Sequence, residues 1–285
     1  MIFDDRACEL GEGAFWHPER EQLFWFDILN RRLMSRQGEA VQTWDMPELT
    51  SACGWIGRDE LLLGSESGLW RFDLVTGARQ ALAEIEAGDA TTRSNDGRAD
   101  RQGGFWLGTM GKRGGADAGK GAIWRWHRGE LRRLFGGLTI PNSICFDRAG
   151  RFAHFSDTLT HRIMKVGLDA EGWPLGTPEV FVDLTAEGLL PDGAVIDADG
   201  NLWNAQWGAG RVACYGPDGR FLRAVDFDAP QTSCPAFGGA GLDVLFCTSA
   251  LEDMDAAARR AHPAAGRVFA RSGVARGLAE PRVAL

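Results

Sequence analysis

One pattern of residues occurs six times along the chain. Each copy begins at a small or polar residue, continues into a strand, turns at Gly, Asp or charged residues, and returns along a second strand rich in aromatic residues. The copies begin near Glu12, Ser51, Asn95, Asn142, Asp192 and Ser233. Successive copies are 39, 44, 47, 50 and 41 residues apart, and propeller blades repeat every ~40–50 residues. The repeat therefore predicts an all-β fold, a six-bladed β-propeller.

The strands within each copy support four-stranded blades around a central channel. A third strand follows in most copies, as at 68–72, 121–126 and 211–215. Short runs of aromatic and β-branched residues between turn signals are typical of all-β proteins, and units that cannot bury their faces alone stack in a ring. Helical periodicity occurs only near 252–260. No linker rich in Pro or Gly divides the chain, so we expect a single domain over residues 1–285.

The run 266–270 resembles the third strand of the other copies. We expect it to complete the last blade. The Gly-rich stretch 111–115 lacks the Lys-Ser/Thr ending of a phosphate-binding loop. We expect this stretch to form a mobile loop at the mouth of the channel.

Charge and hydrophobicity restrict the partners that this protein could have. The 31 basic and 39 acidic residues give a formal net charge of −8, which argues against nucleic acid or an anionic membrane surface as the main partner. The N-terminal residues are charged where a signal peptide would need a basic start and then an apolar stretch, and no run reaches the ~20 apolar residues of a membrane helix. We expect a cytoplasmic protein, a monomer or a weak homo-oligomer, without membrane or nucleic-acid partners.

The cysteines are scattered, and none forms a Cys-x-x-Cys pair. They lie at Cys8, Cys53, Cys145, Cys214, Cys234 and Cys247. Four of the six occur within strand-like runs, where free cysteine behaves as a small buried hydrophobe. We therefore predict six buried free thiols instead of disulfides or metal ligands.

Polar residues at the openings of the repeats are the main candidates for chemistry. The first strand of a propeller blade lines the central channel, so residues that open different copies converge in space. Asn-Asp-Gly and Pro-Asp-Gly are also ordinary turn sequences, and each residue alone could be structural. Recurrence at one position is what favours a site. Glu12, Asp192 and an amide oxygen would give an all-oxygen donor set of charge −2, which suits a divalent cation such as Ca²⁺, Mg²⁺, Mn²⁺ or Fe²⁺.

Several of these segments resemble the gluconolactonase, regucalcin and luciferin-regenerating enzyme family, and the similarity covers nearly the whole chain. The shared motifs follow one another in order. They are Leu-Gly-Glu12-Gly-Ala-Phe-Trp, Thr-Arg93-Ser-Asn95-Asp-Gly, Trp-Leu-Gly-Thr-Met110, Pro-Asn142-Ser, Ser-Asp157-Thr, Pro-Asp192-Gly-Ala-Val and Cys234-Pro-Ala-Phe-Gly-Gly.

The resemblance implies roles for five residues. Glu12, Asn142 and Asp192 match the family's ligands for one divalent metal ion, which is Ca, Zn, Mn, Mg or Fe(II). Arg93 and Asn95 match its substrate-binding residues, and Asp192 is also the position of its general base. The implied activity is a metal-dependent sugar lactonase of carbohydrate metabolism. Such a hydrolase acts on a carboxylic ester bond and converts a pentono- or hexonolactone, of gluconolactone, xylonolactone or arabinonolactone type, to the aldonic acid.

One family feature does not match. A loop glutamate that contacts substrate in some members has no counterpart before Gly121, where the loop contains Asp117. Either Asp117 replaces that glutamate as a substrate-binding residue, or the loop admits a different sugar. Trp16 and Trp207 are candidates to pack on a sugar face, although a tryptophan in a blade more often packs between strands.

Two other functions remain open at this point. A propeller with a metal site could be a non-catalytic, metal- and ligand-binding protein, because a fold does not fix a function. It could also be a promiscuous esterase or organophosphate hydrolase, like the paraoxonase and diisopropylfluorophosphatase propellers. Arg93 beside Asn95 favours catalysis or substrate binding, because a purely structural metal site has no need of a neighbouring cation.

Overall fold

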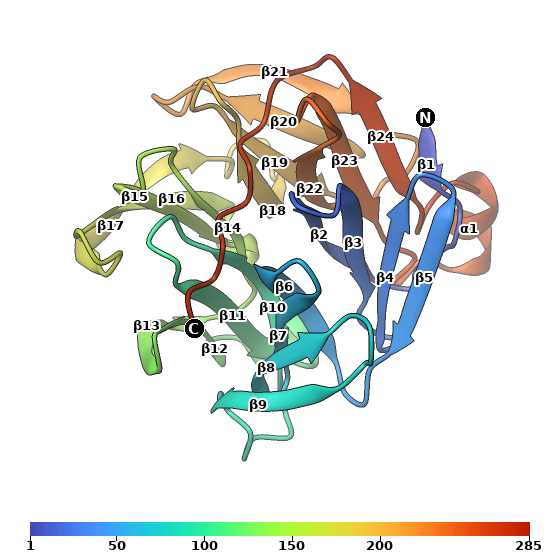
Figure 1. Ribbon diagram of the computed structural model, residues 1–285. Coiled ribbons are helices and arrows are strands. Elements are labelled where there is room, and N and C mark those ends of the chain that lie inside the picture. The colour runs from blue at the N-terminus through green and yellow to red at the C-terminus, as the bar shows by residue number, and fades with distance from the viewer.

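The computed structural model describes residues 1–285, and its strands form six four-stranded antiparallel sheets arranged in a ring (Figure 1). The first blade contains β2 (Gly11–His17), β3 (Gln22–Asp27), β4 (Arg32–Gln37) and β5 (Ala40–Asp45). The second contains β6 (Thr50–Gly57), β7 (Glu60–Ser65), β8 (Gly68–Asp73) and β9 (Arg79–Glu84). The third contains β10 (Thr92–Ala99), β11 (Phe105–Gly111), β12 (Gly121–His127) and β13 (Glu130–Leu138).

The other three blades repeat this order from the channel outward. The fourth contains β14 (Pro141–Phe146), β15 (Phe152–Asp157), β16 (Arg162–Leu168) and β17 (Pro174–Asp183). The fifth contains β18 (Leu190–Ile196), β19 (Leu202–Trp207), β20 (Arg211–Tyr215) and β21 (Phe221–Asp226). The sixth contains β22 (Thr232–Gly238), β23 (Val244–Ser249), β24 (Val268–Ser272) and β1 (Ile2–Asp4). The predicted six-bladed propeller is confirmed.

The sixth blade closes the ring with both ends of the chain. The predicted third strand is β24, which begins two residues later than 266, and the outermost strand is β1, which the sequence did not reveal. Three-residue β1 is too short to show alternating hydrophobicity, which is why it was missed. Its pairing with β24 joins the first residues of the chain to the last blade and leaves no open seam in the ring.

Helices are few. The 3₁₀ turns η1 (Gly114–Asp117) and η2 (Thr158–Thr160) lie in loops, and the only α-helix is α1 (Ala256–Ala261). The Asp255 carboxylate caps α1 by accepting hydrogen bonds from the amides of Ala257 and Ala258. The helix therefore starts later than the predicted 252–260. None of the helices is able to cross a membrane.

The hydrophobic core is divided into six clusters, one between each pair of neighbouring blades. Between the first two blades, for example, Phe24 and Phe26 pack with Leu61 and Leu63. Burying each such side chain stabilises the fold by ~1.5–3 kcal/mol. Because the apolar faces are used between blades, the channel itself is left to the polar residues of the inner strands.

Each inner strand shifts its register near its first residues, and short polar side chains there join one blade to the next. Ser51 Oγ donates a hydrogen bond to Ser94 Oγ of the next blade (2.8 Å). Ser233 Oγ donates to the backbone carbonyl of Gly11. At these two openings the recurrent polar residue is therefore structural, and the larger polar residues at the other four remain candidates for chemistry.

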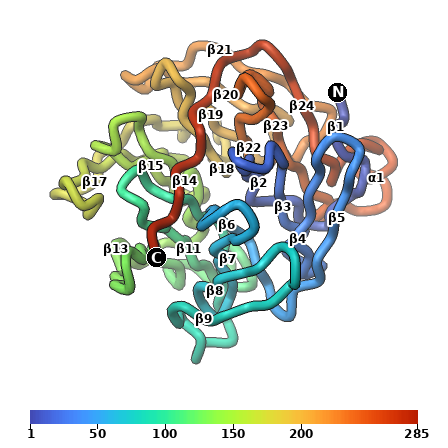
Figure 2. Tube along the Cα trace, viewed as in Figure 1, coloured from blue at the N-terminus to red at the C-terminus, as the bar shows by residue number.

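The chain after β24 crosses the face of the ring at the end where the inner strands finish (Figure 2). The amide of Val283 donates to the carbonyl of Trp55 at the end of β6 (2.9 Å). The amide of Ala284 donates to the carbonyl of Gly103, just after β10 (2.9 Å). This C-terminal segment, residues 276–285, therefore covers one end of the channel.

Candidate functional site

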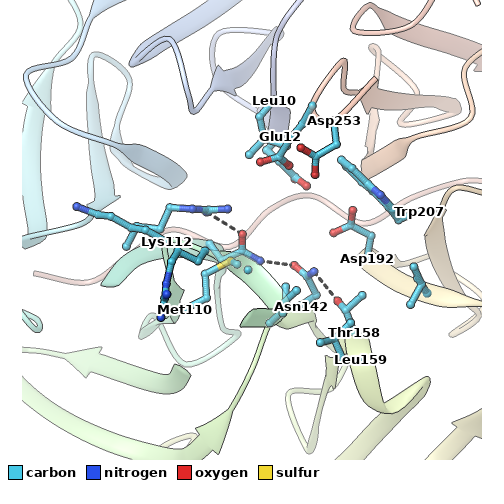
Figure 3. Close-up of a pocket in the computed structure, with 18 residues that line it drawn as sticks. Leu10, Glu12, Met110, Lys112, Asn142, Thr158, Leu159, Asp192, Trp207 and Asp253 are labelled. Carbon is cyan, nitrogen blue, oxygen red and sulfur yellow. Dashed lines mark hydrogen bonds between the residues drawn. The ribbon is translucent and has the colours of Figure 1, made fainter. Parts of the chain in front are cut away.

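A cavity of about 450 Å³ occupies the opposite end of the channel, where the inner strands begin (Figure 3). Five of the predicted site residues line it: Glu12, Arg93, Asn95, Asn142 and Asp192. They come from four different blades and are brought together only by the closure of the ring. The convergence that the repeat predicted is observed for the four opening residues, and Arg93, which only the family resemblance singled out, lies in the same cavity.

Backbone geometry directs Glu12 and Asn142 into the cavity. The residue after each adopts a left-handed conformation, with φ of 60° at Gly13 and 58° at Ser143. At Gly13 a Cβ atom would lie 2.2 Å from the carbonyl oxygen of Ser51, so only glycine fits. These residues coincide with the register shifts of the two inner strands, and such a bulge re-aims a side chain.

The backbone of Asp192 is fixed by two neighbouring side chains. Ser143 Oγ donates to its carbonyl oxygen (2.5 Å), and Asn204 Nδ2 donates to the same oxygen (2.9 Å). Asn204 is fully buried on β19. No side chain donates a hydrogen bond to the Asp192 carboxylate itself, which leaves that group to face the cavity (Figure 3).

A chain of hydrogen bonds links the other polar residues of the site. Arg93 Nη1 donates to Asn95 Oδ1 (3.0 Å), and Asn95 Nδ2 donates to Asn142 Oδ1 (2.8 Å). Asn142 Nδ2 then donates to Thr158 Oγ1 (2.8 Å), and that hydroxyl donates to the carbonyl of Pro191 (2.8 Å). The chain fixes both amide orientations, and a second lone pair of Asn142 Oδ1 remains available.

The two carboxyl groups, Glu12 and Asp192, lack a cationic partner. Burial raises the pKa of Glu12 to about 8, with a further contribution from Asp96. Burial also raises the pKa of Asp192 well above its usual value, and the charge of Glu12 adds to this. Neither forms an ion pair with Lys or Arg, although buried carboxylates normally do. Their mutual repulsion would be relieved by a cation between them.

The donor set fits a divalent ion with oxygen ligands. Glu12 and Asp192 offer carboxylate oxygens, and Asn142 offers an amide oxygen already fixed in orientation. No cluster of three or more His, Cys, Asp or Glu side chains arranged as metal ligands occurs in the structure. Hard oxygen donors of charge −2 suit Ca²⁺, Mg²⁺ or Mn²⁺ better than a structural zinc ion.

Asp117 does not reach the cavity. Its side chain is buried in the loop after β11, where it accepts hydrogen bonds from Arg113 Nη2 (2.6 Å) and the Arg113 amide (3.1 Å) and pairs with Lys120 (3.3 Å). Arg113 holds its pKa well below the usual range. The structure thus gives Asp117 the role of folding the loop, and Lys112 and Arg113 of the same loop line the cavity in its place.

The two candidate tryptophans lie in different places. Trp16 is buried between blades and stacks on Phe246 at 5.7 Å between ring centroids, so it is a core residue. Trp207 lines the cavity beside Asp192 (Figure 3). Sequence reasoning also missed Glu252 and Asp253, which line the cavity from the turn before α1.

Comparison with known proteins places the whole chain in one group. Residues 10–251 match the family described as SMP-30/Gluconolactonase/LRE-like region. The chain is 36% identical over 289 residues to the L-arabinolactonase of Azospirillum brasilense, covering 99% of this chain and 95% of that protein. It is 34% identical to a pentonolactonase of Haloferax volcanii, covering 89% and 86%.

A solved structure is also closely similar. A calcium-binding protein named regucalcin, from Agrobacterium tumefaciens, matches with a TM-score of 0.97 and 38% identity, covering 100% of this chain and 97% of that one. The agreement extends over all six blades, because the match covers the complete chain.

Proposed function

Because the chain belongs to the SMP-30/gluconolactonase/LRE-like family, we propose that it hydrolyses a sugar lactone, a pentono- or hexonolactone, to the aldonic acid with the help of one divalent metal ion. The observation that carries the proposal is the convergence of Glu12, Asn142 and Asp192 with Arg93 on one cavity. The L-arabinolactonase and the pentonolactonase named above support the substrate class. The calcium-binding name of the Agrobacterium protein supports the metal.

The residues of the cavity can divide the work of lactone hydrolysis. Glu12, Asn142 and Asp192 would hold the metal ion, which when bound supplies Lewis-acid polarisation of the lactone carbonyl. Arg93 is buried, and its guanidinium is fixed through Nη1 to Asn95, so its remaining N–H groups are free to bind substrate hydroxyl groups or developing charge.

Asp192 is the candidate general base. Its carboxylate accepts a proton from the attacking water while the water oxygen bonds to the carbonyl carbon and the π electrons of the carbonyl bond move to the carbonyl oxygen. The carbonyl bond then re-forms as the bond from that carbon to the ring oxygen breaks, and Asp192 returns the proton to the ring oxygen, which leaves as a hydroxyl group. Each lactone consumes one water molecule and yields one aldonic acid. No oxidant or reductant is needed.

Proton release from a panel of lactones tests the proposal. We expect the purified protein to contain about one divalent ion per chain, chelation to abolish hydrolysis, and Ca²⁺, Mg²⁺, Mn²⁺, Fe²⁺ and Zn²⁺ to restore it to graded extents. The panel pairs pentono- and hexonolactones with aryl esters as controls for a promiscuous esterase.

Two results would contradict the proposal. Full activity in protein shown by elemental analysis to be metal-free would remove the metal from the mechanism. Binding of lactones without hydrolysis of any, at saturating metal, would make the protein a ligand-binding propeller.

A further inference from the structure

One wall of the cavity is formed by a turn between β23 and α1. Glu252 and Asp253 of this turn line the cavity, and neither belongs to the hydrogen-bond chain of the site. Glu252 is half-buried, and Asp253 is exposed. The cavity is also lined by the cations Arg93, Lys112 and Arg113, all from the third blade or the loop after β11.

The backbone on both sides of Glu252 is fixed. The amides of Leu251 and Glu252 both donate to the carbonyl of Glu9, at 2.9 and 2.8 Å. Gln231 Nε2 donates to the carbonyl of Glu252 (2.8 Å). Asp253 takes the left-handed conformation, with φ of 59°, which turns the chain back toward α1. A residue fixed in this way presents its side chain at one place in the cavity.

Helix α1 holds the turn through one side chain. Arg259 donates to the carbonyls of Met254 (2.9 Å) and Leu251 (3.1 Å), and its Nη2 pairs with the Glu9 carboxylate (2.5 Å). Arg259 therefore clamps the two ends of the turn and the segment to which the turn is bonded. Through Arg259, α1, the only α-helix, therefore holds the turn that lines the cavity.

Glu252 and Arg93 line the same cavity without forming an ion pair. Burial lowers the pKa of Arg93, and Glu252, ahead of Glu12 and Asp192, raises it, so Glu252 is the carboxylate that acts most strongly on this guanidinium. Yet no nitrogen of Arg93 lies within 4.0 Å of a carboxylate oxygen of Glu252. The gap between a donor-only group and an acceptor-only group suits a hydroxyl group, which accepts from one and donates to the other.

We propose that Glu252 is a substrate-binding residue that accepts a hydrogen bond from a hydroxyl group of the sugar ring opposite Arg93, and that Arg259 is its positioning residue. This inference rests on the proposed function and adds a determinant of substrate choice to it. Glu252 discriminates hydroxylated lactones from plain aliphatic lactones, because a lactone without hydroxyl groups leaves a desolvated carboxylate unpaired.

Steady-state kinetics of Glu252→Ala on two kinds of lactone tests the proposal. We expect kcat/KM for a hydroxylated pentono- or hexonolactone to fall roughly 10- to 100-fold, as for loss of a hydrogen bond to a charged group. With δ-valerolactone, which has no hydroxyl group, kcat/KM should rise instead of falling, because the variant no longer has a carboxylate that this substrate leaves unpaired. For the hydroxylated lactone, kcat/KM of Glu252→Gln should lie between those of the parent and Glu252→Ala, because glutamine keeps a hydrogen-bond acceptor. Glu130→Ala, at an exposed residue of β13, is the matched control.

The role of Arg259 is tested by a double-mutant cycle. Arg259→Ala should raise KM for the hydroxylated lactone and leave kcat/KM for δ-valerolactone unchanged. If Arg259 acts through Glu252, the double variant loses no more activity than Glu252→Ala alone. Full additivity of the two losses would remove Arg259 from the proposal.

The outcomes separate this inference from the proposed function. An equal loss on both kinds of lactone, or no loss on either, overturns the role of Glu252 even when the parent is a good lactonase. If the parent hydrolyses no lactone, the proposed function fails, and calorimetry with the sugar alcohol glucitol still tests the subsite. Glucitol binding that is weakened by Glu252→Ala, and not by Glu130→Ala, supports the subsite, and equal binding overturns it.

Discussion

The two ends of the central channel are built by the same six inner strands, and they differ in how charge is paired. Where the strands begin, Glu12 and Asp192 face a cavity of about 450 Å³ and form no ion pair. Further along, Arg98 on β10 pairs with Glu280 of the C-terminal segment, and the two side chains are 9% and 8% exposed. One end leaves its charges for a ligand, and the other neutralises them within the chain.

What covers the two ends differs in the same way. At the closed end the C-terminal segment supplies the carbonyl of Glu280 to Trp55 Nε1 (2.9 Å), and the cavity beneath it has a volume of only about 20 Å³. At the open end the loop after β11 and the turn before α1 line the cavity, which keeps a volume of about 450 Å³. We infer that the closed end contributes mainly to stability and the open end mainly to function, although both lie on one set of strands.

The largest expected effect lies at the closed end. Arg98→Ala leaves Glu280 buried without its partner, and removing one partner of a buried pair costs about 3–5 kcal/mol of unfolding free energy. Chemical denaturation measures this loss. At a temperature where the variant is folded, kcat/KM for lactones should stay within about twofold of the parent, because Arg98 does not line the active cavity.

The matched control replaces both charges. Arg98→Met combined with Glu280→Leu removes the pair without stranding a charge, and we expect it to recover most of the stability. A tenfold loss of kcat/KM in folded Arg98→Ala would mean that the two ends are coupled and would break the comparison.

The next largest effect lies at the open end. Asp192→Asn keeps the size of the side chain and one of its two oxygens, as an amide oxygen, while removing its charge and basicity. We expect kcat to fall at least ~100-fold, about 2.7 kcal/mol of transition-state stabilisation. With the metal removed from both proteins by a chelator, the melting temperature of the variant should not be lower than that of the parent, because the substitution removes repulsion with Glu12.

Metal occupancy must be matched before this loss is assigned to catalysis. Asp192→Asn also removes a ligand, so kcat is compared at metal concentrations that saturate each protein. Parental kcat with the metal bound would show that Asp192 is not the general base. A large fall in melting temperature would show that the open end also stabilises the fold.

The sequence predicted the blades but not the strand pairing that closes the ring. Each blade repeats its own local pattern, because every blade buries the same two faces, and a repeat of that kind is visible in one chain. The pairing of β1 with β24 depends on residues more than 260 apart and on a three-residue strand that carries no pattern. Nothing local distinguishes Ile2–Asp4 from a loop.

The site shows the same division. Glu12, Asn142 and Asp192 occupy recurrent positions, so the repeat brings them to the channel. Asp117 lies in an insertion outside the repeat, and whether it faces the cavity depends on its bonds to Arg113 and Lys120, which the sequence does not show. Glu252 was hidden in an apparently helical stretch, because the cap at Asp255 separates it from α1.

The smallest expected effect is that of thiol reagents and reducing agents on the parent protein, whose thiols should be unreactive. All six cysteines are free and buried, as predicted, and burial raises their thiol pKa values, to about 12 at Cys8 and about 11 at Cys214. Because the thiolate is the reactive form, we expect no labelling by a thiol reagent without denaturant. Reducing agent should change neither the melting temperature nor the rate of hydrolysis.

The same thiols can report which end of the channel opens. Cys145 lines the small cavity beneath the C-terminal segment together with Arg98 and Glu280, whereas Cys214 lies between the fifth and sixth blades. In Arg98→Ala, loosening of the segment should expose Cys145 before Cys214, which peptide mass mapping after brief labelling would detect. In Asp192→Asn both should stay protected, because that substitution alters only the open end. Equal labelling of Cys145 and Cys214 in Arg98→Ala would indicate global unfolding, and the closed end would then not be a separate unit of stability.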